Sequence, residues 1–180
     1  MNNITNYKLG KEMIAMDKKM LIAYYSLSSA NTKKIAEMLQ KSTNADIVRI
    51  ETVEPYNGSY ETIVNQGQNE VNRGYKPDIK PLQVKMSEYD VIAVGTPTWW
   101  YTMAPAVHTF LDWNDWKGKT AIPFMTNGGW PGHVIEDMKV CCKGAKFVCE
   151  KEIQFDSTGG SNLETPLQEI EQWIEEIKSL

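Results

Sequence analysis

The sequence predicts an α/β fold in which a doubly wound, five-stranded parallel sheet forms the middle of three layers. Short apolar runs alternate with amphipathic stretches five times along the chain. Most of these runs are continuously apolar, which is typical of strands covered on both faces. Strands and helices in regular alternation build a parallel sheet through right-handed crossovers. Five strands in 180 residues indicate the order 2-1-3-4-5, with a ligand site beyond the carboxyl ends of strands one and three.

The expected strands and helices alternate along the chain. The strands are predicted at residues 21–25, 47–50, 91–94, 121–125 and 146–155. Helices are predicted at residues 31–42, 59–72, 105–113 and 133–143, and a final helix follows Thr165. Pro123 conflicts with the fourth strand, because its missing N–H removes a ladder hydrogen bond. Either a bulge or a different strand boundary is expected there.

The final helix has the most complete set of sequence signals. Thr165 as the cap, Pro166 in the first turn and Gln168 three residues after Thr165 predict a capping box. Its apolar stripe consists of Leu167, Ile170, Trp173 or Ile174, and Ile177.

One domain is expected at residues 19–180, preceded at residues 1–18 by an added segment or a loosely docked arm. No run approaches the roughly 20 apolar residues of a spanning helix, and the first residues lack a secretory pattern. A cytoplasmic protein without a membrane partner is therefore expected, with its three cysteines reduced. The net charge of −4 leaves residues 20–160 nearly neutral, which argues against nucleic-acid binding. We expect a monomer or a homodimer.

The loop after the first predicted strand is rich in hydroxyl groups. It consists of Ser26, Leu27, Ser28, Ser29, Ala30, Asn31 and Thr32. These residues stand at a helix N-terminus, where backbone N–H groups and the helix dipole favour an anion. A phosphate-binding loop is therefore predicted. In the alternative interpretation, Ser29 or Asn31 only caps the helix.

The loop after the third strand is rich in aromatic rings. It contains Thr96, Pro97, Thr98, Trp99, Trp100 and Tyr101. Neighbours on an extended segment face opposite ways, so at least one of the three rings should be exposed or covered by a ligand. Large rings at this edge of the sheet suit a flat, π-rich ligand. In the alternative, two rings pack under the third helix and one remains for a ligand.

The loop after the fourth strand contains paired glycines. Its residues are Thr126, Asn127, Gly128, Gly129 and Trp130. Glycines let backbone N–H groups approach a ligand closely. A Gly-Gly turn is a weak signal alone, and it matters here because the loop faces the same crevice as the other two.

Together these residues resemble the flavodoxin family. The similarity rests on Ala23-Tyr24-Tyr25-Ser26 with Asn31-Thr32, on Gly95 to Tyr101 with Ala104-Pro105 and Thr109-Phe110-Leu111, and on Gly118-Lys119 with Pro123 to Gly129. It extends from about Met20 to Leu180 and is greatest to short-chain, flavodoxin-like bacterial proteins. The chain departs from the family pattern at Ala30, where glycine is usual, in a loop one residue longer. A second departure is Trp130, which would stack on the flavin or partly cover it.

The resemblance implies FMN as cofactor, with its phosphate in the first loop and its ring in the other two. It implies electron transfer with redox partner proteins or a small electron acceptor. No catalytic side chain is required, because the flavin performs the redox chemistry. The alternative is an FMN-dependent NAD(P)H or quinone oxidoreductase of the same fold. The small net charge favours this alternative, whereas the lack of a Gly-x-Gly-x-x-Gly motif argues against it.

Other functions find less support in the sequence. Gly95 and Thr96 stand where a phospho-receiver domain has its aspartate, and no cysteine begins the Cys-x5-Arg motif of small phosphatases. His108 is interpreted as a helix-face residue and His133 as a cap or surface residue. Because these histidines are far apart in sequence and the cysteines are unpaired, no metal site is expected. Three tyrosines either border the crevice or pack the second helix: Tyr56, Tyr60 and Tyr75.

Overall fold

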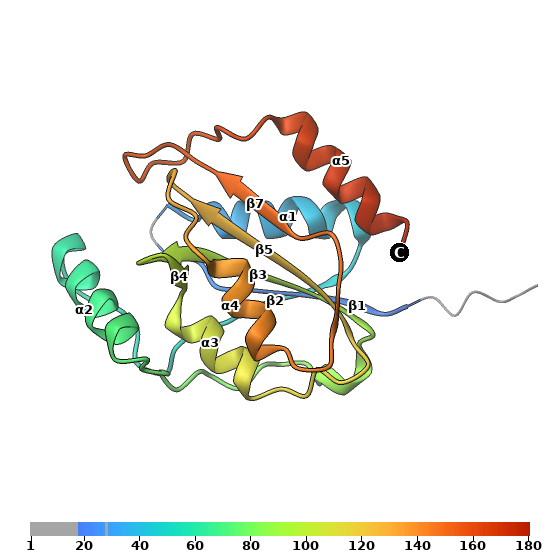
Figure 1. The fold of residues 1–180 in the computed structure, drawn as a ribbon, viewed down its shortest axis with the longest axis horizontal. Coiled ribbons are helices and arrows are strands. Elements are labelled where there is room, and N and C mark those ends of the chain that lie inside the picture. The colour runs from blue at the N-terminus through green and yellow to red at the C-terminus, as the bar shows by residue number, and fades with distance from the viewer. Residues whose placement is uncertain (1–17, 28) are drawn as a thin grey trace, which may run out of the picture.

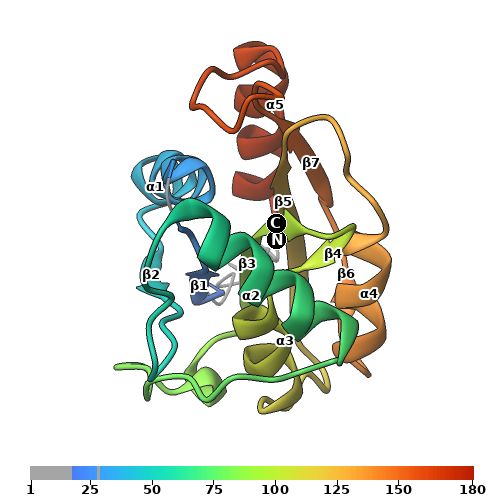
Figure 2. The same cartoon turned by 90° about the vertical axis from the view of Figure 1, so that its left-hand side faces the viewer.

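The computed structural model describes residues 18–27 and 29–180. A twisted sheet forms the middle layer, with α1 (Asn31–Thr43) and α5 (Leu167–Lys178) on one face and α3 (Pro105–Asp112) and α4 (Val134–Cys141) on the other (Figures 1 and 2). The predicted arm, apart from Lys18, lies outside the described residues, and so does Ser28. The three-layer α/β fold predicted from the sequence is confirmed.

The sheet has the predicted parallel order. Its path is β2-β1-β3-β5-β6, and β7 also pairs with β5, while β4 is antiparallel to β3. The strands are β1 (Met20–Tyr24), β2 (Asp46–Arg49), β3 (Val91–Trp99), β4 (Thr102–Met103), β5 (Thr120–Asn127), β6 (Lys146–Phe147) and β7 (Lys151–Gln154). The other helical elements in the described part of the chain are α2 (Tyr60–Asn72) and a 3₁₀ turn (Met86–Glu88).

Within the described residues the sheet has seven strands rather than five, partly because the predicted strand at residues 146–155 is interrupted. Cys149 is in the left-handed conformation with φ 50°, and its carbonyl accepts a hydrogen bond from Trp173 Nε1 at 2.6 Å. Residues 148–150 lie between β6 and β7, opposite Ile122 and Pro123 of β5. Three residues therefore face two, so the irregularity lies on the outer strand. Pro123 stays within β5, paired with Val94 of β3.

The final helix begins differently from the prediction. Its N-cap is Pro166, and Thr165 Oγ1 accepts a hydrogen bond from Gln154 N at 2.8 Å instead of capping the helix. The predicted capping box is therefore wrong, because β7 competes for the threonine hydroxyl. Leu167 is half exposed, and the buried stripe consists of Ile170, Trp173, Ile174 and Ile177.

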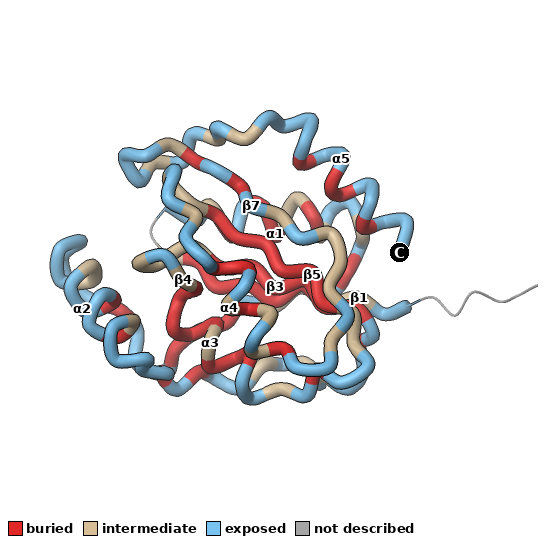
Figure 3. Tube along the Cα trace, in the orientation of Figure 1, coloured by how far each residue is buried: buried red, intermediate tan, exposed pale blue. Residues whose placement is uncertain are grey.

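Two apolar clusters bury the faces of the sheet, and the central strands are buried almost throughout (Figure 3). One cluster lies under α3 and α4 and the other under α1 and α5. Gly95 of β3 is required by this packing, because a Cβ there would lie 2.2 Å from Cζ of Phe124. Within the described ranges, no helix combines the length and apolar character needed to cross a membrane.

Candidate functional site

The first predicted loop connects β1 to α1. Ala30 is the N-cap of α1, with φ 57°, and its methyl group cannot accept a hydrogen bond. The first N–H groups of α1 therefore receive no acceptor from the cap residue. Ser29 Oγ donates to Gly159 O at 2.5 Å, and Asn31 Nδ2 donates to Gly160 O at 2.9 Å. The alternative in which Ser29 or Asn31 caps the helix is wrong.

Polar groups of this loop are buried beneath its surface. Thr32 Oγ1 and Thr126 Oγ1 share a hydrogen bond of 2.8 Å, which joins the first loop to the end of β5. Ser26 is also buried. In the described part of the chain, Asn31 Oδ1 is buried without a hydrogen-bond partner. Buried acceptors are nearly always satisfied in folded proteins, so this oxygen is suited to a donor from a ligand.

The aromatic loop forms a tight hairpin. β3 continues to Trp99, and β4 returns beside it with Trp99 opposite Thr102. The two turn residues, Trp100 and Tyr101, have φ angles of 45° and 67°. Two-residue hairpin turns of this kind usually contain asparagine or glycine, since bulky residues are disfavoured at positive φ. Backbone strain of this type is concentrated at functional sites.

Gly132 supports this strained turn. Its φ is 65°, and a Cβ at this position would lie 2.1 Å from the carbonyl oxygen of Tyr101. The same oxygen accepts a hydrogen bond from His133 N at 2.8 Å. The sequence analysis missed Gly132, because the contact joins two loops about 30 residues apart.

The two tryptophans pack toward α2 rather than under α3 as the alternative expected. The ring of Trp99 lies edge-on to Tyr56, with ring centroids 5.1 Å apart, and to Trp100, at 6.4 Å. A Cβ on Gly67 of α2 would lie 3.0 Å from Trp100 and 3.1 Å from Trp99. Tyr101 is 56% exposed, as expected for at least one of the rings.

Tyr56 packs against Trp99 and is itself held by hydrogen bonds. Its hydroxyl donates to the buried carboxylate of Glu70 at 2.5 Å, and Gln66 Nε2 donates to the same carboxylate at 2.9 Å. Burial raises the pKa of Tyr56, and the bond to Glu70 raises it further, so the phenol stays protonated. Tyr56 thus packs in the core, whereas Tyr60 borders the pocket and is 76% exposed.

The third loop follows β5. Asn127 Oδ1 accepts a hydrogen bond from Gly129 N at 2.7 Å, which fixes the start of the turn. Gly128 packs close to the next loop, because a Cβ there would lie 3.3 Å from Asp156 O. Trp130 is 57% exposed.

A fourth loop, at residues 155–162, was missed by the sequence analysis. The Asp156 carboxylate accepts hydrogen bonds from its own loop, from Gly160 N and Asn162 N at 2.9 Å each and from Thr158 Oγ1 at 2.6 Å. These bonds lower the pKa of Asp156 to about 2. The loop follows β7 and meets the first loop through Gly159 and Gly160. The detectable signal was an aspartate before Ser-Thr-Gly-Gly at the end of a parallel strand.

One pocket of about 520 Å³ lies among these loops at the carboxyl ends of the strands. Its size is typical of small-molecule sites. It is lined by twelve of the predicted residues: Ser26, Leu27, Ser29, Asn31, Thr32, Pro97, Thr98, Trp99, Trp100, Thr126, Asn127 and Gly128. It is also lined by residues outside the three predicted loops, namely Tyr60, Ile63, Val64, Phe155, Asp156, Thr158 and Gly159. Among the described residues, no lysine or arginine lines it.

Five predicted residues lie outside the pocket lining: Ala30, Thr96, Tyr101, Gly129 and Trp130. Thr96 has a structural role, because its buried hydroxyl accepts a hydrogen bond from Ala104 N at 3.0 Å. Ser28 lies outside the described residues. The pocket thus has hydroxyl groups and a helix N-terminus at one end and aromatic rings with an apolar wall from α2 at the other.

The comparisons with known proteins agree with this architecture. A family model described as flavodoxin matches residues 19–177, and the chain belongs to the flavodoxin family. It is similar to the crystal structure of a candidate flavoprotein from Bacteroides eggerthii, with 26% identity, a TM-score of 0.71 and coverage of 91% of this chain and 99% of that one. The comparison with curated proteins finds no match.

Two further structures share the fold and contain FMN. A flavoprotein from Lactobacillus acidophilus in complex with FMN has 22% identity and a TM-score of 0.63, over 87% of this chain and 98% of that one. A Fusobacterium nucleatum flavodoxin bound to flavin mononucleotide has 18% identity and a TM-score of 0.52, over 90% and 98%.

Proposed function

We propose that this chain binds FMN in the pocket and acts in electron transfer. The observation that supports it most is the two-ended pocket, where hydroxyl groups at the N-terminus of α1 adjoin the rings of Trp99 and Trp100. The FMN-bound relatives of the same fold support the same cofactor. When bound, FMN supplies reversible one- and two-electron transfer.

The residues at the phosphate end fit this cofactor without a positive side chain. The N–H groups of the first turn of α1 and the helix dipole favour a phosphate. Ser29 and Thr158 also line the pocket, and their hydroxyl groups, which donate to Gly159 O and Asp156 in this structure, would rotate to donate to a phosphate. The unpartnered Asn31 Oδ1 accepts from a donor such as a ribityl hydroxyl.

The residues at the other end fit a flat ring. Trp100 and the apolar wall of Ile63 and Val64 provide contact area and exclude water from it. Gly128 brings backbone close to the pocket without a side chain. Tyr60 stands exposed beside this end, where a partner protein or a small electron acceptor would approach.

The test is a titration of the ligand-free protein with FMN, followed by visible absorption after removal of free ligand. We expect about one equivalent of retained flavin, and tighter binding of FMN than of riboflavin, which lacks the phosphate. Trp100→Leu should weaken FMN binding, whereas Trp113→Leu, at a 60% exposed position outside the pocket lining, should not. No retention of FMN, or equal effects of the two substitutions, would contradict the proposal.

A second candidate is an FMN-dependent NAD(P)H or quinone oxidoreductase acting at the same pocket. The net charge of −4 favours it, because a weakly charged surface offers little steering toward a charged partner protein. Steady-state oxidation of NADPH by the FMN-loaded protein separates the two. A carrier oxidises NADPH only when a reductase is added, whereas the oxidoreductase does so alone with a quinone as acceptor.

A further inference from the structure

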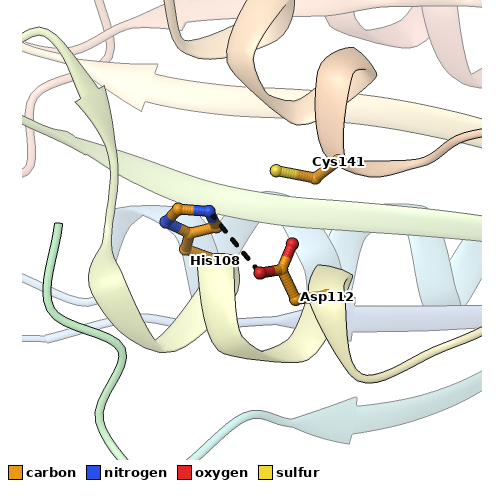
Figure 4. Close-up of side chains that lie close together, drawn as sticks. All are labelled: His108, Asp112 and Cys141. Atoms are coloured by element: carbon orange, nitrogen blue, oxygen red, sulfur yellow. Dashed lines mark ion pairs between the residues drawn. The ribbon is translucent and has the colours of Figure 1, made fainter.

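Three side chains with metal-ligating atoms meet between α3 and α4, away from the pocket lining. His108 and Asp112 lie one turn apart on α3, and Cys141 is the last residue of α4 (Figure 4). Their ligand atoms all lie within 4.8 Å of one another, and His108 Nε2 is 3.9 Å from Asp112 Oδ2. The sequence analysis expected no metal site, because the two histidines are far apart in sequence and the cysteines are unpaired.

The positively charged side chain of Lys76 already contacts this cluster. The Lys76 ammonium contacts the Asp112 carboxylate, and this bond lowers the pKa of Asp112. The lysine charge also acts on His108 and Cys141. The side chain of Lys76 is 42% exposed, so it can move into solvent at little cost.

Two of the three side chains, His108 and Asp112, are already in the protonation state that binds a metal ion. Burial lowers the pKa of His108, so its imidazole is neutral and has a free lone pair at pH 7. The Asp112 carboxylate is ionised. Burial raises the pKa of Cys141 to about 11, so the thiol must lose its proton when a metal binds.

We propose that His108, Asp112 and Cys141 form a binding site for Zn²⁺, with the fourth position open to water and Lys76 displaced. Imidazole, carboxylate and thiolate together suit this borderline-soft ion. Zinc–ligand distances of about 2.0–2.3 Å require ligand atoms about 3.3–3.8 Å apart in a tetrahedron, which small side-chain rotations supply. On binding, the S–H bond of Cys141 breaks, a sulfur–zinc bond forms, and the proton passes to buffer.

A second carboxylate supports the charge balance of the site. Asp137 lies one turn before Cys141 on α4, and its charge acts on both His108 and Cys141. It is held by Thr102 Oγ1 and by His133 Nδ1, so it stays outside the set of three ligands. The zinc ion would join α3 to α4 and so stabilise the folded protein in proportion to its occupancy.

The experiment uses the full chain without a histidine tag, freed of metal and kept reduced by a phosphine. Co²⁺ is the first probe, because a cobalt–thiolate bond produces a charge-transfer absorption band, and Zn²⁺ is then added in competition. We expect the band with wild type and with Cys149→Ser, a matched control at a cysteine outside the cluster, and its loss with Cys141→Ser. A band absent from wild type, or lost equally in both variants, would overturn the site.

Two further variants keep the test decisive if Cys141→Ser does not fold. Asp112→Asn, at an exposed position, should weaken zinc binding at least about tenfold. Lys76→Gln should tighten it about fivefold, the factor that corresponds to one unit-charge contact at 4 Å in water. Weaker binding or no change in Lys76→Gln would overturn the proposal, since an adventitious surface site does not compete with this lysine.

Discussion

Substitution of Gly132 by alanine tests whether the strained hairpin of Trp100 and Tyr101 depends on the glycine behind it. The new Cβ would lie 2.1 Å from Tyr101 O and 2.4 Å from its Cα, so backbone must move. Gly74→Ala is a matched control, because Gly74 has φ +60° against +65° for Gly132, and its Cβ would meet nothing within 4 Å. The two variants share the conformational cost of alanine at positive φ and differ in the contact.

The magnitudes follow from these contacts. Alanine in the left-handed region costs about 1–2 kcal/mol, which is the whole effect expected for Gly74→Ala. Gly132→Ala has two further costs. The hydrogen bond from His133 N to Tyr101 O is lost, which costs about 1 kcal/mol, and overpacking against the turn costs about 1–3 kcal/mol. We therefore expect a loss of about 3–6 kcal/mol in the free energy of unfolding for Gly132→Ala.

Urea unfolding measures this difference, and FMN titration measures its consequence for the pocket. A displaced turn moves Trp100, and the loss of one aromatic contact, about 0.5–1.5 kcal/mol, corresponds to as much as about tenfold in the Kd for FMN. Gly74→Ala should bind FMN like wild type. Equal unfolding midpoints for the two variants would refute the role given to the contact between Gly132 and the turn.

Three further predictions concern the loops and the α2 wall. Gly67→Ala should leave the thermal midpoint nearly unchanged, because about 1 kcal/mol of helix propensity offsets the close contact with the two tryptophans, while the Kd for FMN rises. Thr32→Val leaves the buried hydroxyl of Thr126 without a partner and should lower the free energy of unfolding by about 1–3 kcal/mol. In a double-mutant cycle of urea unfolding, the variant with valine at both positions should lose less free energy than the two single variants added together. The pKa of Asp156 is lowered to about 2, so its contribution to stability is present above about pH 4 and is lost as the pH falls toward 2. Between these pH values, the urea midpoint of Asp156→Asn should therefore depend less on pH than that of wild type.

The fold was predictable from the sequence because each layer has a local pattern. Continuous apolar runs predicted strands covered on both faces, and their number indicated the strand order. The conflict at Pro123 also pointed to a real irregularity, although it lies on the neighbouring strand at Cys149. The capping box at Thr165 failed for the opposite reason. A local motif was complete, but β7 supplied a competing donor, Gln154 N, that no local pattern contains.

The site was predictable only where it follows a strand directly. The hydroxyl-rich loop and the aromatic loop could be found this way, since the carboxyl ends of parallel strands meet at one edge. Gly67 and Gly132 could not, because each matters through the absence of a side chain opposite a ring or a carbonyl from a distant segment. Trp130 lies outside the pocket lining, so its predicted contact with a flavin stays a prediction.

The hairpin explains why three consecutive aromatics do not behave as an extended segment. On a strand, Trp100 would face away from Trp99, but the left-handed turn at Trp100 and Tyr101 folds both tryptophans toward Gly67 of α2. The turn is maintained from outside by Gly132, because glycine alone allows the carbonyl of Tyr101 to approach so closely. The aromatic end of the pocket therefore depends on two glycines in other segments, and its shape is set by these tertiary contacts more than by the aromatic sequence itself.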